Sequence, residues 1–118
     1  MTGLADKSCV PCRGGVPPLD KAQRQALLAE LGAGWGITEV EGAAPKLEKT
    51  YAFDDFVSAL AFTNRVGEVA EAEGHHPDLY LAWGRATVWI WTHKIDGLTE
   101  SDFVLAAKIE GLTTNSDS

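Results

Sequence analysis

Two hydrophobic periodicities alternate along the chain, and this alternation limits the possible fold more than any other feature of the sequence. Three stretches carry apolar residues at helical spacing, and four short stretches are rich in β-forming residues. Glycine, proline or aspartate separates them, as is typical of turns and helix ends. The expected elements are helix 20–32, strands 35–40 and 46–53, helix 55–74, strands 79–83 and 86–93, and helix 99–111.

The order of these elements predicts an α+β fold. Strands that are joined by short turns pair in antiparallel fashion, and the apolar face of the resulting sheet must be covered by helices. We therefore expect a four-stranded antiparallel sheet with three helices on one face, that is, a two-layer sandwich. A chain of 118 residues suits a single domain, which we expect over residues 19–112, after an irregular arm at 1–18 and before a flexible tail at 113–118.

Local signals define the expected helices more closely. Asp20, with Gln23 three positions later, has the spacing of a capping box at the start of the first helix. The second helix is expected to bury a stripe at helical spacing, formed by Phe56, Leu60, Thr63, Val66, Val69 and Ala70. Thr99, with Asp102 three positions later, is expected to open the third helix, and Gly111 is expected to end it.

Composition excludes several classes of function. The formal net charge of −7 argues against a direct nucleic-acid surface, which needs clustered lysine and arginine. No run of about 18 apolar residues is present, so we expect no membrane span. Residues 1–18 lack a basic end followed by an apolar stretch and are not expected to be a secretory signal. With only two cysteines, the chain is expected to work in the reducing cytoplasm.

The three histidines are the strongest candidates for chemistry. His75 and His76 follow the second helix directly, and His93 ends the last strand. A hairpin brings the start of its first strand opposite the end of its second, so His76 and His93 are expected to meet at one edge of the sheet. Imidazoles titrate near neutral pH and are suited to general acid–base catalysis. For any single histidine, the alternative is an ordinary surface or packing residue.

Carboxylates and indoles lie close to these histidines in the sequence. Glu71 precedes His75 by one helical turn, and both Glu71 and Asp78 are candidates to orient or charge-tune an imidazole. Trp89 and Trp91 alternate onto the same strand face as His93, so we expect either indole to flank a flat heterocycle. Packing in the core or at an interface is the alternative for some of these aromatic residues.

Metal binding is the rival interpretation of the histidines. Three imidazoles and a carboxylate resemble a zinc site, but adjacent residues of a strand point to opposite faces, so His75 and His76 do not easily share one ion. We therefore expect no metal. Cys9 and Cys12 have the spacing of a metal or redox pair, but no second pair completes a zinc site, and their role stays open.

The sequence resembles the pterin-4a-carbinolamine dehydratase family from about Leu19 to Ile109. The strongest motifs are a glutamate four residues before His-His-Pro-Asp at 71–78, Thr-His at 92–93, and Gly-Leu-Thr-Glu-x-Asp-Phe at 97–103. Residues 53–56, which lead into the second helix, and residues 61–62 within it also resemble the family. The resemblance implies the same four-stranded antiparallel sheet with three helices.

The resemblance also implies an activity. The family dehydrates 4a-hydroxytetrahydropterins to quinonoid dihydropterins, which recycles the cofactor of aromatic amino acid hydroxylases, and it needs no metal or organic cofactor. His75, His76 and His93 match its three active-site histidines, and Glu71 matches its nearby carboxylate. We interpret His75 and His76 as the acid–base pair and His93 as the residue that positions or protonates the pterin.

A non-catalytic role on the same fold is the alternative function. Relatives of the family serve as a dimerisation cofactor of a transcription factor or assist Rubisco assembly. The complete histidine set favours the enzyme. Edge strands could pair between subunits, so we expect a homodimer or homotetramer.

Overall fold

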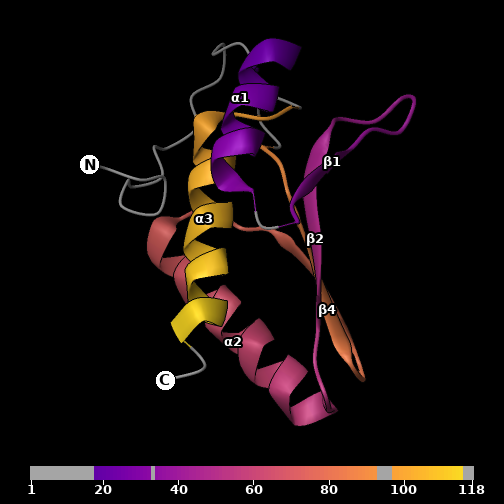
Figure 1. The fold of residues 1–118 in the computed structure, drawn as a ribbon, viewed down its shortest axis with the longest axis vertical. Helices are drawn as coiled ribbons and strands as arrows, with labels where there is room; N and C mark the ends of the chain where they lie inside the picture. The colour runs from indigo at the N-terminus through magenta and orange to yellow at the C-terminus, as the bar shows by residue number, and fades with distance from the viewer. Residues whose placement is uncertain (1–17, 33, 93–96, 116–118) are drawn as a thin grey trace.

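The expected fold class is confirmed. In the computed structural model, which describes residues 18–32, 34–92 and 97–115, three helices cover one face of a four-stranded antiparallel sheet (Figure 1). The elements are α1 (Lys21–Leu31), β1 (Gly36–Thr38), β2 (Lys46–Ala52), α2 (Phe56–Glu73), β3 (Asp78–Ala82), β4 (Arg85–Ile90) and α3 (Glu100–Asn115). None of the helices in this part of the chain is long and apolar enough to cross a bilayer.

The sheet order is β1-β2-β4-β3, so β3 and β1 form its edges. Strands β3 and β4 form the expected hairpin, with Ala82 opposite Arg85 at its closed end. Strand β4 also pairs with β2, with Leu47 opposite Ile90 and Glu48 opposite Trp89. The start of β3 and the end of β4 therefore lie at the same end of the sheet.

The predicted helix starts are confirmed. The backbone N–H of Gln23 donates to Asp20 Oδ1 at 2.8 Å, and the N–H of Asp20 donates to Gln23 Oε1 at 2.9 Å, which completes a capping box. Asp55 caps α2 by accepting from the N–H of Ser58. These contacts satisfy backbone donors that have no partner inside a helix.

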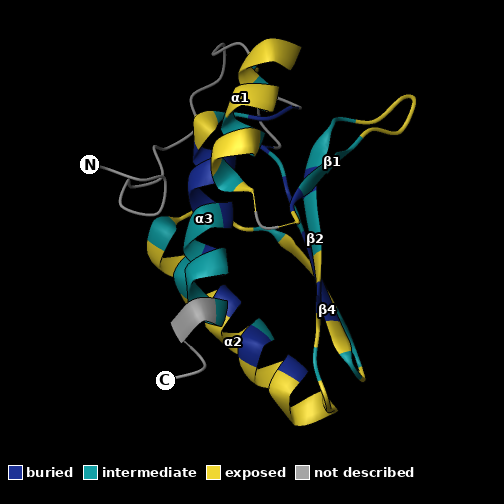
Figure 2. Ribbon diagram, viewed as in Figure 1, coloured by how far each residue is buried: buried dark blue, intermediate teal, exposed yellow. Residues whose placement is uncertain are grey.

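The core lies between the sheet and the helices (Figure 2). Its sheet side alternates as expected, with Leu47, Val88 and Ile90 fully buried. The stripe expected on α2 is partly wrong. Val66 and Ala70 of the expected stripe are buried, but Phe56 and Leu60 are exposed, and Ala59 and Phe62 complete the buried face in their place.

The expected end of the last helix at Gly111 is also wrong. Helix α3 continues through Gly111 to Asn115, which lies within the segment expected to be a tail. Gly111 does not adopt the positive φ of a helix-ending glycine. Leu112 packs against the core one residue later, and this tertiary contact favours continuing the helix. Strand β1 is shorter than the expected 35–40.

Candidate active site

A glycine at the end of α2 sets the direction of the two histidines that follow it. Gly74 has φ 66° and ψ 25°, the left-handed conformation that terminates a helix. Its N–H donates to the last turn of α2, and the N–H of His75 donates to the carbonyl of Ala70 at 3.2 Å. The backbone of His75 is therefore held against the helix before β3 begins.

His75 turns inward and contacts a buried carboxylate. Its Nε2 lies 2.6 Å from Oδ1 of Asp102, whose side chain is fully buried. The second oxygen of Asp102 accepts from Thr92 Oγ1 at 2.8 Å and from the backbone N–H of Thr99 at 2.7 Å. Asp102 thus joins the end of α2, the end of β4 and the start of α3.

With Asp102 ionised, this contact selects one tautomer of the imidazole. An ionised carboxylate can only accept hydrogen bonds, so Nε2 of His75 carries the proton that points at Asp102. In the neutral ring, Nδ1 then holds the lone pair. A carboxylate on one nitrogen also stabilises the imidazolium that forms when the other nitrogen takes up a proton.

His76 is oriented outward. Its side chain is 64% exposed, and its Nε2 lies 3.3 Å from Oε1 of Glu71, which is 72% exposed. An exposed pair of this kind holds its geometry weakly. The two adjacent imidazoles therefore differ in environment, since one is fixed and buried and the other is accessible.

Of the two predicted indoles, Trp89 lies on the sheet face that points away from the helices, whereas Trp91 follows the end of β4 and is partly buried against the core. Trp89 alternates with the buried residues Val88 and Ile90, and its indole N–H donates to Glu48. In register, Trp89 lies opposite Asp78 of β3. Lys46 Nζ lies 4.2 Å from the centre of the Trp91 ring.

The structure brings some of the predicted site residues together. His75 reaches Asp102, His76 reaches Glu71, and Asp78 lies across the hairpin from Trp89. His93 lies outside the described residues, so its expected meeting with His76 stays a prediction. Cys9 and Cys12 lie outside them as well. Within the described part of the chain, no three His, Cys, Asp or Glu side chains lie close enough to hold a metal ion.

Asp102 is the residue of this site that the sequence did not reveal. Its place three positions after Thr99 predicted a helix start, and it does accept from the N–H of Thr99. The same carboxylate also holds His75, which no local pattern indicates. The available signals were the Thr-x-x-Asp spacing and the place of Asp102 in the family motif at 97–103.

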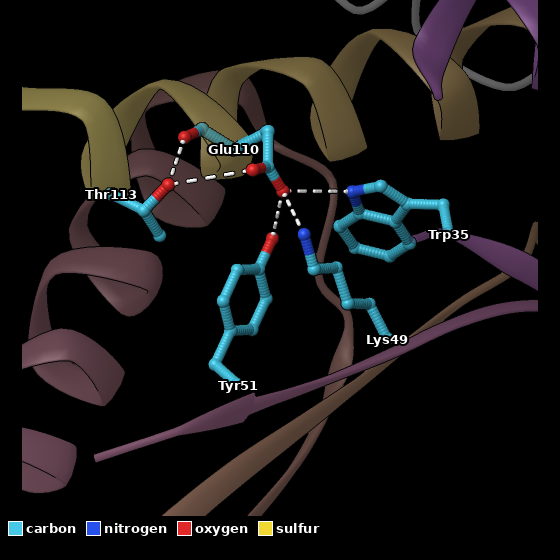
Figure 3. Close-up of polar contacts among 5 residues, drawn as sticks. All are labelled: Trp35, Lys49, Tyr51, Glu110 and Thr113. Atoms are coloured by element: carbon cyan, nitrogen blue, oxygen red, sulfur yellow. Dashed lines mark hydrogen bonds and ion pairs between the residues drawn. The ribbon is translucent and has the colours of Figure 1, made fainter. Parts of the chain in front are cut away.

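A second carboxylate, Glu110 of α3, gathers three donors from the sheet side (Figure 3). Its Oε1 accepts from Tyr51 OH at 2.7 Å, Lys49 Nζ at 2.8 Å and Trp35 Nε1 at 3.2 Å. We call these four residues the Glu110 cluster. Their hydrogen bonds connect α3 to strand β2. This cluster was not predicted from the sequence.

The Glu110 cluster shifts the acidity of its members. Burial raises the pKa of Glu110, but the hydrogen bonds from Lys49 and Tyr51 outweigh burial and hold that pKa below its usual range. Burial raises the pKa of Tyr51, and its hydrogen bond to the Glu110 carboxylate adds to the increase. Glu110 is therefore an ionised acceptor at neutral pH.

A family model and curated relatives of this chain point to the same protein family. The family described as "Pterin 4 alpha carbinolamine dehydratase" matches residues 17–112. A Rickettsia canadensis protein named "Putative pterin-4-alpha-carbinolamine dehydratase" is 54% identical, covering 93% of this chain and 97% of its own. A Rubrobacter xylanophilus protein of the same name is 50% identical, covering 95% of this chain and 100% of its own.

Solved structures agree with the sequence relatives. A transcriptional coactivator/pterin dehydratase from Brucella melitensis superposes with a TM-score of 0.70 at 29% identity, covering 80% of this chain and 97% of its own. A pterin dehydratase-like protein identified as a RuBisCO assembly factor of the alpha-carboxysome superposes with a TM-score of 0.57 at 19% identity, covering 70% and 92% of the two chains. The second likeness shows the fold alone.

Proposed function

The chain belongs to the pterin-4-alpha-carbinolamine dehydratase family, and on that premise we propose that it dehydrates 4a-hydroxytetrahydropterins to quinonoid dihydropterins. The proposed substrate is 4a-hydroxytetrahydrobiopterin or a close analogue. The reaction would recycle the cofactor of aromatic amino acid hydroxylases in the cytoplasm. It uses no metal and no organic cofactor.

The proposed reaction needs one proton donor and one proton acceptor. The C4a–O bond breaks, and the departing hydroxyl takes up a proton and leaves as water. N5 loses its proton, and the electron pair of the N5–H bond forms the C4a=N5 double bond. Proton transfer by positioned side chains accelerates such steps by about 10²–10⁴-fold.

The observation that carries the proposal is the contrast between two adjacent imidazoles, one anchored at Nε2 by Asp102 and one accessible. In our proposal, neutral His75 accepts the N5 proton at Nδ1, and Asp102 stabilises the imidazolium that results. His76, as imidazolium beside Glu71, donates a proton to the leaving hydroxyl. Asp78 supports this pair from the start of β3.

Four further residues complete the proposed site. His93 is included from the family resemblance, as the group that positions or protonates the pterin. Trp89 or Trp91 is proposed to flank the pterin ring, because Trp89 lies opposite Asp78 where β3 begins and Trp91 follows the end of β4. Asp102 is a positioning residue, since it acts through His75.

We also propose self-association as a homodimer or homotetramer. Strand β3 is an edge of the sheet, and it exposes Leu79 and Tyr80, with Trp83 69% exposed in the hairpin turn. Exposed apolar edge strands commonly pair with a second chain. Light scattering that gives the mass of a monomer at micromolar concentration would contradict this part of the proposal.

Quinonoid dihydropterin formation tests the function. An aromatic amino acid hydroxylase generates the 4a-hydroxytetrahydropterin in place, and the absorbance of the quinonoid product is followed with and without the protein. We expect acceleration above the buffer rate, and loss of that acceleration in His76→Ala. Glu68→Gln, on the exposed face of α2, is the matched control and should retain full activity.

The same assay separates the alternative function. The Brucella melitensis relative is described as both a coactivator and a dehydratase, so a binding role on this fold is the second candidate. A folded wild-type protein that leaves the dehydration at its buffer rate would favour a non-catalytic binding protein. In that case, a partner such as a transcription factor or Rubisco would be sought.

A further inference from the structure

We infer that a pocket between α2, α3 and the end of β2 binds a small aromatic carboxylate. The pocket has a volume of about 240 Å³. Its lining combines aromatic rings with one cation and two hydroxyls, from Tyr51, Phe53, Phe62, Arg65, Leu112 and Thr113. Figure 3 shows Tyr51 and Thr113 beside Glu110, so the pocket lies next to the Glu110 cluster.

The aromatic side of the pocket consists of rings packed against one another and suits a flat ligand ring. The rings of Tyr51 and Phe62 have centroids 4.6 Å apart, and those of Phe53 and Phe62 are 5.2 Å apart. The hydroxyl of Tyr51 already donates to Glu110 at 2.7 Å, so Tyr51 offers the pocket its ring. Pockets lined by aromatic and apolar side chains with a few polar groups are typical small-molecule sites. A single aromatic ring matches the modest volume.

The charge at the pocket favours an anion. The nearby carboxylate of Glu110 is paired with Lys49 Nζ at 2.8 Å, and the hydroxyl of Thr113 donates to the Glu110 carbonyl at 2.8 Å. Arg65 is exposed and forms no ion pair within the part of the chain that the structure describes. Its planar guanidinium is therefore available for a carboxylate, which it can bind through two parallel hydrogen bonds.

The pocket is separate from the candidate active site. Arg65 precedes His75 by ten positions, which corresponds to about 15 Å at the rise of an α-helix. The inference therefore does not depend on the proposed dehydratase activity. A failed binding test would leave the proposed dehydratase activity standing, and a failed activity test would leave the proposed binding site standing.

Titration with phenylacetate tests the inference on the full-length protein, with backbone amide chemical shifts as the measurement. We expect saturable binding with a dissociation constant of about 1 mM, given the few atoms of the probe. Shifts should concentrate at Phe62, Arg65 and Leu112. Arg65→Gln should weaken the binding of phenylacetate about tenfold or more, because a charge-assisted hydrogen bond is lost. The uncharged analogue 2-phenylethanol should bind the wild-type protein about as weakly as phenylacetate binds Arg65→Gln.

Arg85→Gln is the matched control, since Arg85 is an exposed arginine of β4 outside the pocket, and it should bind as the wild type does. Arg65→Lys keeps the charge without the planar fork and should fall between wild type and Arg65→Gln. Equal affinity in Arg65→Gln, or no saturation at about ten times the expected constant, would overturn the inference. Shifts confined to His75 and His76 would do the same, because the probe would then occupy the other site.

Discussion

His75 and Asp102 are 27 positions apart in the sequence, yet their side chains lie 2.6 Å apart in the fold. The contact joins the segment between α2 and β3 to the first turn of α3, across the end of the β3–β4 hairpin. Thr92 and Thr99 occupy the other oxygen of the carboxylate. The acid–base chemistry that we propose and the packing of three segments thus share one buried side chain.

Asp102→Asn should lower both the stability and the activity. The side-chain amide replaces one acceptor oxygen of the carboxylate by a donor. Depending on which oxygen is replaced, either the ring Nε2–H of His75 or the donors from Thr92 and Thr99 lose their acceptor. A buried donor without an acceptor costs about 1–3 kcal/mol, and urea unfolding measures this loss. Dehydratase activity should fall by more than the unfolded fraction of the protein explains, because the tautomer of His75 is no longer fixed. The ¹⁵N chemical shifts of the His75 ring report the tautomer.

Asp102→Glu serves as the partner variant. It keeps the charge and displaces the carboxylate by one methylene, so the ring shifts should stay closer to those of the wild type. If Asp102→Asn left the tautomer and the residual specific activity unchanged, Asp102 would be only a structural residue.

Replacing each of the adjacent histidines by alanine should have unequal effects on stability. His75→Ala leaves the fully buried carboxylate of Asp102 without one partner and should cost about 2–4 kcal/mol. His76→Ala removes an exposed side chain and should stay within about 0.5 kcal/mol of the wild type. Both should lose dehydratase activity. Equal destabilisation by the two substitutions, measured by urea unfolding, would contradict the inward and outward placement of the two rings.

Much of this fold could be predicted because its signals are local. The Asp20–Gln23 capping box and the left-handed Gly74 follow from residues within a few positions of each other. The helix end expected at Gly111 failed because packing of Leu112 against the core outweighs a helix-propensity cost of about 1 kcal/mol. Helical spacing alone likewise did not decide which face of α2 meets the sheet.

The site was harder to predict because its decisive contacts are long-range. Glu110 lies 59 positions from Tyr51 and 61 from Lys49, and neither distance leaves a periodic trace in the sequence. Asp102 was recognised for its local role at the start of α3 and as part of the family motif at 97–103, but not as a partner of His75. His75 and His76 were identified from residue type and position, but their different environments follow from the tertiary fold.

Gly97→Ala should destabilise the protein, whereas Gly67→Ala should not. A Cβ on Gly97 would lie 2.8 Å from Cβ of Pro18, where Leu19 donates to the carbonyl of Leu98. Either the segment before α1 or the turn before α3 must then move, at a cost of about 1–3 kcal/mol. Gly67, inside α2, has no heavy atom within 4 Å of a Cβ, so alanine there should stabilise by about 0.5–1 kcal/mol. Thermal unfolding of both variants measures the contrast, and an unchanged midpoint in Gly97→Ala would contradict the close approach of Pro18.

Glu110 should make the stability of the protein depend on acid pH. The folded state holds the pKa of this carboxyl below its ordinary value of 4.5, because donors from Lys49 and Tyr51 stabilise the ionised form. A lowered folded pKa contributes stability that is fully present above pH 4.5 and is lost as the pH falls through the folded pKa. Urea unfolding at neutral pH and at a series of pH values below 4.5 should therefore show a decline to which Glu110 contributes.

Glu110→Gln isolates this contribution. The amide keeps one acceptor oxygen but loses the charge, so at neutral pH we expect a loss of about 1–2 kcal/mol. As the wild-type carboxyl becomes protonated, the difference between the two proteins should shrink. Tyr51→Phe removes one donor and leaves Lys49 paired with the carboxylate, so it should retain part of the pH dependence. A difference between wild type and Glu110→Gln that stayed constant from neutral to acid pH would show that the ionised form of Glu110 is not what holds α3 to the sheet.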